Sequence, residues 1–105
     1  MLARVDGDRA MMRVLAGIFL EKAPARLSRL GASVEAGDLQ AVAMEAHAFK
    51  GELGNLSAQA ASHGAGRLQQ AAKAGDIHAV GRCWESFRQD HALLVEALRQ
   101  ALLTV

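Results

Sequence analysis

The fold is decided by residues 39–56, which read LQAVAMEAHAFKGELGNL. Apolar side chains recur here at intervals of three and four, the period of an amphipathic helix with one buried face. His47 stands one residue past a core position, about 100° further round the helix. We therefore expect its ring at the edge of the buried face, within reach of water. The core positions are Leu39, Val42, Ala46, Phe49 and Leu53.

Two neighbours of His47 on the helix surface suit phosphoryl chemistry. Lys50, at i+3, can bring a cation to an anion carried by the imidazole. Gly51, at i+4, leaves bare backbone over which a second protein can approach closely. A histidine side chain is mostly neutral at physiological pH and is then a nucleophile. The nucleophilic ring, the cation and the cleared space together predict phosphoryl transfer through His47.

The run AHAFKGELGNL at residues 46–56 resembles the motif of histidine-containing phosphotransfer (HPt) domains, the carriers of multistep two-component phosphorelays. The likeness extends over nearly the whole chain, through FLEKAP at 19–24 and AGD at 74–76. Three residues depart from the family pattern: Glu52 replaces a small residue, Ser57 replaces a common glycine, and Gln69 replaces a common glutamate. Glu52 places an acid near the expected docking surface.

The resemblance implies a phosphocarrier that is not a self-sufficient enzyme. It would accept a phosphoryl group from a receiver-domain aspartate and pass it to another receiver, with a sensor histidine kinase further upstream. No cofactor is expected on this chain, and Mg²⁺ is expected on the partner receiver, since carboxylates do not cluster near His47. The implied roles are phosphorylation at His47, charge stabilisation by Lys50, partner docking over Gly51, Gly54 and Ala43, and loop ordering by Asn55.

No alternation of β-branched residues competes with the helical pattern. We predict an all-α chain, an up-down four-helix bundle with an additional N-terminal helix that caps one end. The capping helix is expected from about Asp8 to Lys22, and Pro24 suits the first turn of the next helix, where its missing N–H costs nothing. The inward side of the capping helix is expected to hold Met11, Met12, Leu15, Ile18 and Phe19.

Gly37-Asp38 and Gly75-Asp76 indicate two tight turns between helices. In each pair the glycine suits the left-handed position that ends a helix, and the aspartate suits the N-cap of the next. The helix that carries His47 is expected over about Leu39–Leu53, with a left-handed exit at Gly54-Asn55.

Ser57 is expected to cap the following helix, which contains Gly64 and Gly66. Glycine inside a helix costs about 1 kcal/mol relative to alanine, which indicates a close approach to the helix that bears His47. The last helix begins near Ile77 and is expected to be the longest. Inward positions are Ala61, Ala65, Leu68 and Ala72 in the first of these helices, and Ile77, Val80, Trp84, Phe87, Leu94, Leu98 and Ala101 in the last.

Composition limits the classes of function. The 105 residues carry 12 basic and 11 acidic side chains, a formal net charge of +1 and no basic stripe, which argues against nucleic-acid binding. Hydrophobic residues make up 51% but aromatic ones only 4%, so alanine and aliphatic packing must dominate the core. The length predicts one small domain over 1–105. The resemblance implies that this domain is HPt-like, either free-standing or excised from a hybrid sensor kinase.

The longest apolar stretch, Val14 to Leu20, is shorter than the roughly 20 residues that cross a bilayer, so no membrane contact by this domain is expected. Cys83 is the single cysteine and cannot pair internally, which favours a reducing compartment. We expect a cytoplasmic monomer, or the cytoplasmic part of a membrane-anchored sensor kinase.

The other histidines have structural interpretations. His91 falls on the core side of the last helix, in step with Phe87, and is expected to be partly buried and hydrogen-bonded locally. His63 and His78 show no partner. No two histidines stand three or four residues apart, so no metal site is expected.

Three other classes stay open. The dimerising hairpin of sensor kinases typically has an acid after the histidine and a proline soon afterwards, whereas Ala48 follows here and Pro24 is the only proline. The phosphotransfer domain of a chemotaxis-type histidine kinase has similar chemistry, although Asn55-Leu56 favours the relay type. In a noncatalytic helical adaptor, His47 would be incidental.

Overall fold

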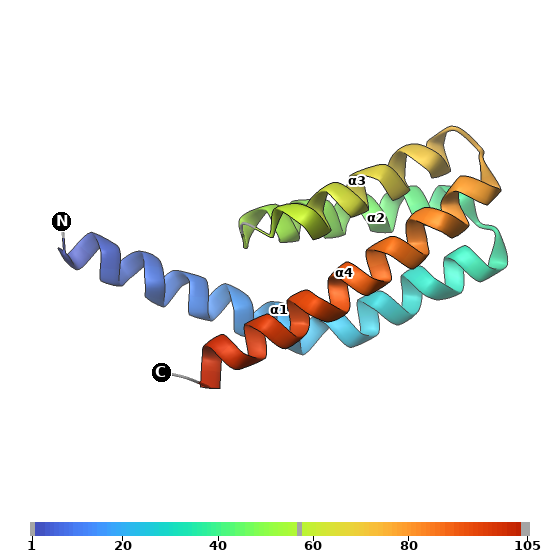
Figure 1. The fold of residues 1–105 in the computed structure, drawn as a ribbon. Coiled ribbons are helices and arrows are strands. Elements are labelled where there is room, and N and C mark those ends of the chain that lie inside the picture. Colours follow the sequence, from blue (N-terminus) through green and yellow to red (C-terminus); the bar gives the residue numbers. More distant parts are fainter. Residues whose placement is uncertain (1, 57, 104–105) are drawn as a thin grey trace.

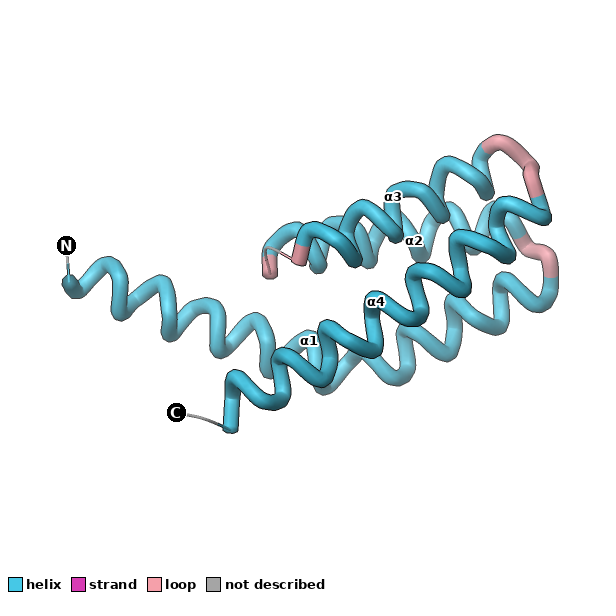
Figure 2. The backbone as a smooth tube through the Cα atoms, viewed as in Figure 1, coloured by secondary structure: helices cyan, strands magenta, loops and turns pink. Residues whose placement is uncertain are grey.

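The computed structural model describes the backbone of residues 2–56 and 58–103, with side chains from Ala10 onward in these ranges. They contain four helices: α1 (Leu2–Ala36), α2 (Leu39–Asn55), α3 (Gln59–Lys73) and α4 (Ile77–Leu103). The helices run alternately up and down, and α4 returns to lie against α1 (Figure 1). Short turns join α1 to α2 and α3 to α4 (Figure 2). The all-α, up-down four-helix prediction is confirmed.

Both predicted glycine–aspartate turns are confirmed. Gly37 and Gly75 have φ angles of 68° and 73°, in the left-handed region that glycine adopts without a Cβ penalty. The amides of Asp38 and Asp76 each donate to the carbonyl five residues earlier, which closes a Schellman motif. Each aspartate side chain also accepts a hydrogen bond from the amide three residues later. Local sequence therefore fixes the turns that stack α2 on α1 and α4 on α3.

The predicted helix boundary before Pro24 is wrong. The separate capping helix over about Asp8–Lys22 is not found, because α1 runs unbroken with Pro24 inside it. A proline in a helix interior removes one backbone hydrogen bond, costs about 3 kcal/mol and commonly bends the helix. Figure 1 shows a change of direction midway along α1. The helix continues because both flanks of Pro24 contribute buried core side chains: Phe19 and Ala23 before it, and Leu30 after it.

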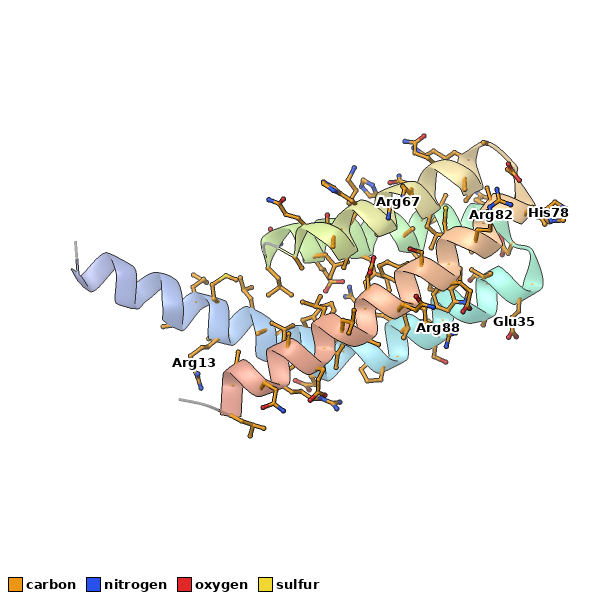
Figure 3. The ribbon with its side chains drawn as sticks, viewed as in Figure 1. Arg13, Glu35, Arg67, His78, Arg82 and Arg88 are labelled. Carbon is orange, nitrogen blue, oxygen red and sulfur yellow. The ribbon has the colours of Figure 1, made fainter. Side chains whose placement is uncertain are left out.

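The N-terminal half of α1 projects beyond the α2–α3 pair (Figure 1). Met11, Met12 and Ile18, predicted to face inward, are therefore on the surface, with Met11 59% exposed. Phe19 is buried and Leu15 half-buried, as predicted. Arg13 is exposed on this projecting segment (Figure 3). The spacing of its apolar residues gives this part of α1 an apolar side, but none of the described helices lies where it would cover that side.

Phe49 of α2 lies at the centre of the core. Its ring centroid is 5.3 Å from that of Phe87 and 5.6 Å from that of His91, both on α4. Burying such a ring contributes roughly 2–3 kcal/mol. The predicted buried faces of α2 and α3 are confirmed, with Leu39 half-buried and these residues buried: Val42, Ala46, Phe49, Leu53, Ala61, Ala65, Leu68 and Ala72.

The predicted left-handed exit from α2 is wrong. Gly54-Asn55 stay helical, and the C-cap is Leu56 with φ of −91°. The amide of Leu56 donates to the carbonyls of Glu52 and Leu53, and its side chain is buried. The helix therefore continues through Gly54 and Asn55 and ends at Leu56, whose side chain is buried.

The start of α3 differs in part from the prediction. Ser57, the predicted N-cap, lies outside the described residues, and the N-cap is Ala58, with no side-chain hydrogen bond. Gly64 faces α4 and not α2, since a Cβ added there would lie 3.5 Å from the ring of Phe87. Gly66 faces the helix that bears His47, as predicted, and its contact belongs to the site below.

The longest described helix is α1, with 35 residues against 27 in α4, because it joins two of the predicted helices. In α4, Val80 and Phe87 are buried as predicted. Ile77 and Ala101 are exposed instead, since they lie in the first turn and close to the end of the helix, beyond the core. No helix in the described ranges is both long and apolar enough to span a membrane.

Candidate functional site

His47 lies on the outer side of α2 with an exposed side chain. Its neighbours Ala46 and Phe49 are buried, and their burial sets the rotation of α2 about its own axis. This rotation leaves His47 at the boundary between the core and solvent. The prediction that its ring is reachable from water is confirmed.

The ring of His47 is held from the neighbouring helix by Gln69. The amide nitrogen of Gln69 lies 3.2 Å from Nδ1 of His47. Gln69 is only 8% exposed, so its side chain reaches the ring from within the α2–α3 interface. Nε2 of His47 has no hydrogen-bond partner among the described residues. One ring nitrogen is thus occupied and the other is open.

The orientation of the Gln69 amide decides which nitrogen is nucleophilic. An amide presents either its nitrogen or its oxygen after a rotation of about 180°. With nitrogen toward the ring it donates to Nδ1, and the proton of a neutral imidazole sits on Nε2. With Oε1 toward the ring it accepts from Nδ1–H, and the lone pair is on Nε2. The second arrangement places the reactive lone pair on the exposed nitrogen of His47.

Lys50 lies one turn after His47, exposed and against α3. The hydroxyl of Ser62 donates to the carbonyl oxygen of Lys50 at 3.3 Å. A Cβ added to Gly66 would lie 3.7 Å from Cδ and 4.0 Å from Nζ of Lys50. Lys50 forms no ion pair with any part of the chain that the structure describes. Its ammonium is therefore available to an incoming anion.

The remaining predicted site residues differ in how far they are exposed and in what they contact. Gly51 and Gly54 are exposed, and a Cβ added to either would meet no atom within 4 Å. The fold does not need glycine at these positions, so their bare surface is open to a partner. Ala43 is half-buried and packs against the core, so it offers less surface. Asn55 is exposed at the end of α2, and its side chain hydrogen-bonds to none of the described residues.

Met44 adds an apolar side chain to this surface. It is 67% exposed and precedes His47 by three residues, so it lies on the same side of α2. Ala48, beside His47, is also exposed. The solvent side of α2 therefore combines apolar side chains and bare backbone around the imidazole.

Glu52 does not present a free negative charge to this surface. It is ion-paired with Arg26 of α1, and the two side chains are 29% and 32% exposed. Half-buried pairs of this kind contribute little stability, about 0–1 kcal/mol when solvent screens them. Arg26 nevertheless neutralises the acid that departs from the family pattern.

His91 is separate from the site. Its ring is 3% exposed and lies within 6 Å, centroid to centroid, of Phe19, Phe49 and Phe87. The expected local hydrogen bond is not made by Nε2, which is buried without a partner. Burial lowers the pKa of His91 below its ordinary value, because the charged ring would lose its hydration. His91 is therefore a neutral core residue.

The other histidines do not gather around His47. His63 is exposed on α3, and His78 projects at the end of the molecule where α3 turns into α4 (Figure 3). Among the side chains of residues 10–56 and 58–103, no three from His, Cys, Asp or Glu come together as a metal site.

Sequence reasoning missed the three residues that contact His47 or Lys50 from α3, namely Ser62, Gly66 and Gln69. Gln69 carried a signal, since it stands next to the core residue Leu68 and departs from a common glutamate. Gly66 was noticed only as an unfavourable helix residue. The contacts with His47 and Lys50 depend on how α2 and α3 pack, which the spacing within either helix does not give.

Two comparisons relate the chain to known proteins. Residues 14–103 match the family model described as Hpt domain. The solved structure of histidine-containing phosphotransfer protein B (HptB) from Pseudomonas aeruginosa PAO1 superposes with a TM-score of 0.85 at 27% sequence identity. The match covers 99% of this chain and 89% of that one. No curated protein matches the chain.

Proposed function

The chain belongs to the Hpt domain family and is a histidine phosphotransfer intermediate of a two-component phosphorelay; we propose that His47 is its phosphorylated residue. It accepts the phosphoryl group from the aspartate of one receiver domain and passes it to the aspartate of another. The observation that carries this proposal is the pair of unequal ring nitrogens. Nδ1 is held by buried Gln69, while Nε2 of the exposed His47 side chain has no hydrogen-bond partner within residues 10–56 and 58–103.

The transfer conserves charge and protons in a simple way. The lone pair on Nε2 attacks phosphorus, a P–N bond forms, and the P–O bond to the aspartate breaks, releasing its carboxylate. The ring then carries positive charge, with its proton still on Nδ1. When the Gln69 amide is rotated by about 180°, so that Oε1 replaces the amide nitrogen beside Nδ1, Oε1 accepts a hydrogen bond from that proton and stabilises the charged ring. The reverse sequence of bonds delivers the group to the next receiver.

Lys50 supports this step electrostatically. The phosphoryl group carries negative charge on its oxygens as it moves between the acceptor and the donor. The ammonium of Lys50 lies one turn from His47, forms no ion pair with the described residues, and offsets part of that charge. Mg²⁺ is assigned to the receiver, because the acids on α2 do not surround His47 and Glu52 is already paired with Arg26.

Receiver domains dock, in this proposal, on the solvent side of α2. Met44 and Ala48 provide apolar contact, and Gly51 and Gly54 allow close approach of the partner's backbone. Ala43 contributes at the half-buried edge of this surface. Small, transient interfaces suit a carrier that must release one receiver before it binds the next. We propose that the protein acts as a monomer, which leaves this side of α2 free.

The test is phosphoryl transfer from a receiver charged with acetyl phosphate in the presence of Mg²⁺. Label is expected on a base-stable, acid-labile site, and is expected to be lost in His47→Gln. His63→Gln is the matched control, because His63 is also exposed but lies on α3. Retention of label by His47→Gln, or its loss in His63→Gln alone, would overturn the assignment.

A further inference from the structure

Gly66 is the residue of α3 that lies against the side chain of Lys50. A Cβ added there would be 3.7 Å from Cδ, 3.8 Å from Cε and 4.0 Å from Nζ of Lys50. All three atoms belong to the outer part of the lysine side chain. The side chain of Lys50 therefore lies across the backbone of α3 at Gly66, and its ammonium group lies close to the same residue.

The register of the two helices explains this contact. α2 and α3 are antiparallel neighbours (Figure 1). Gln69 meets His47, and three residues earlier on α3, Gly66 meets Lys50, which follows His47 by three residues. Ser62, one further turn along, donates to the carbonyl oxygen of Lys50. Residues on successive turns along one side of α3 thus contact His47 and Lys50.

The glycine is not explained by core packing. Gly64, two residues earlier, is buried against Phe87, whereas Gly66 is half-buried and has only Lys50 within 4 Å of an added Cβ. Glycine is unfavourable within a helix because of its backbone entropy. At this position it leaves a shallow seat for the methylene groups of a long cationic side chain, which commonly lie along a protein surface while the charge stays in water.

We propose that Gly66 is a positioning residue for phosphoryl transfer, and that it seats the side chain of Lys50 so that the ammonium stays beside the imidazole. The inference rests on the proposed function, and in particular on the role of Lys50. Gly66 touches neither the phosphoryl group nor the receiver. A side chain that fills the seat forces Lys50 into other rotamers, and the ammonium then spends less time within reach of Nε2.

The test uses substitutions of graded size at Gly66. Gly66→Ala is expected to keep the wild-type transfer rate, because the added Cβ stands at ordinary contact distance from Lys50. Gly66→Leu is expected to slow transfer by about as much as Lys50→Ala, roughly 10-fold for one displaced charge-stabilising group at an exposed site. His63→Leu, one turn earlier at an exposed position of α3, is the control and is expected to leave the rate unchanged. Circular dichroism checks that each variant is folded.

The decisive measurement is a double-mutant cycle. In a Lys50→Ala background, Gly66→Leu is expected to cause no further loss of rate. An equal loss with and without Lys50 would show that the glycine acts through docking or folding, and would overturn the proposal. An unchanged rate in Gly66→Leu, or in Lys50→Ala itself, would overturn it too. In these cases, loss of label in His47→Gln still shows that the phosphocarrier function stands.

A second pair of variants tests the contact by charge at constant size. Gly66→Asp places a carboxylate next to the ammonium of Lys50, whereas Gly66→Asn places a neutral amide of the same shape. We expect Gly66→Asp to transfer more slowly than Gly66→Asn, and the difference to shrink at high salt because this pair is exposed. The difference is expected to vanish in Lys50→Ala. Equal rates of the two variants in the presence of Lys50 would contradict the seating of its ammonium at this position.

Discussion

The side-chain amide nitrogen of Gln69 lies 3.2 Å from Nδ1 of His47, so the group that orients the candidate nucleophile comes from a different helix. Gln69 is buried in the α2–α3 interface, while the ring that it holds is exposed. Positioning of the imidazole and packing of the bundle are therefore coupled. A change in how α3 lies on α2 would also change the ring's orientation.

Removal of the Gln69 side chain is expected to slow phosphoryl transfer. In Gln69→Ala the ring loses its partner at Nδ1 and rotates more freely, so productive alignment for attack becomes rarer. A loss of roughly 10-fold to 100-fold is expected, in line with the cost of small misplacements of reacting groups. Time courses of transfer from a labelled receiver measure it.

Gln69→Glu is the matched variant for this prediction. A glutamate also accepts a hydrogen bond from Nδ1–H, so its rate is expected to stay much closer to that of the wild type than Gln69→Ala does. ¹⁵N chemical shifts of His47 report which nitrogen carries the proton, and Gln69→Glu is expected to favour Nδ1. A wild-type rate in Gln69→Ala would remove Gln69 from the mechanism.

Gly51 is expected to matter for docking and not for folding. A Cβ at this position meets no atom within 4 Å, so Gly51→Ala is expected to raise the free energy of unfolding by up to about 1 kcal/mol through helix propensity. A longer side chain in Gly51→Gln is expected to leave the fold intact but to weaken receiver binding, seen as a higher KM for the charged receiver.

Gly17→Gln is the control for Gly51→Gln. Gly17 is also an exposed helix glycine with open space around it, but it lies on α1. Its substitution is expected to leave the KM unchanged. Equal KM values for the wild type and Gly51→Gln would mean that receivers do not dock over this part of α2.

Burial of His91 is expected to make the fold less stable in mild acid. Its pKa is lowered in the folded state, so the unfolded chain takes up the proton first as pH falls below the ordinary histidine value of about 6.5. The free energy of unfolding then falls until the lower folded-state pKa is reached, and this contribution is fully present above about pH 7. Urea unfolding at a series of pH values measures the slope.

His91→Leu is expected to flatten this slope, because the substituted side chain binds no proton in either state. It also removes Nε2, which is buried without a hydrogen-bond partner. His63→Gln, at an exposed position, is expected to keep the wild-type slope. If His91→Leu loses stability in acid as steeply as the wild type, another group is responsible for the dependence.

Two glycines on α1 are expected to respond oppositely to alanine. At Gly31 an added Cβ would lie 3.0 Å from Cζ2 of Trp84, so the indole would have to shift by a few tenths of an ångström. Gly31→Ala is therefore expected to destabilise the bundle by about 1 kcal/mol, since overpacking outweighs the gain in helix propensity. Gly17→Ala, with nothing within 4 Å, is expected to stabilise it by a similar amount.

Thermal and urea unfolding of this pair measure the contrast directly. Both substitutions change backbone entropy in the same way, so the difference between them isolates the contact with Trp84. A stabilised Gly31→Ala protein would show that Trp84 moves away from α1 at little cost.

Local sequence determined the features that depend on neighbouring residues alone. The turns at Gly37 and Gly75 were predictable because a left-handed residue favours glycine and an N-cap favours aspartate. The buried side of α2 was predictable because its apolar residues share one helical period, and this same period placed His47 at the edge of the core.

The predictions that were wrong concern features in which local conformational preference competes with packing. Pro24 disfavours helix locally, yet burial of Phe19 and Leu30 on its two flanks holds α1 in one piece. Met11 has the right spacing for a core side, but α1 projects beyond the helices that would cover it. Spacing describes one helix at a time and does not show where its neighbours end.

The sequence by itself thus determined an all-helical chain with an exposed histidine beside a lysine. Only the tertiary structure decided what surrounds that pair, namely Gln69 at the ring and Gly66 beneath the lysine. The physical reason is that these contacts cross between two helices. They are set by the depth and register at which α2 and α3 pack, and these depend on all the side chains of the interface together.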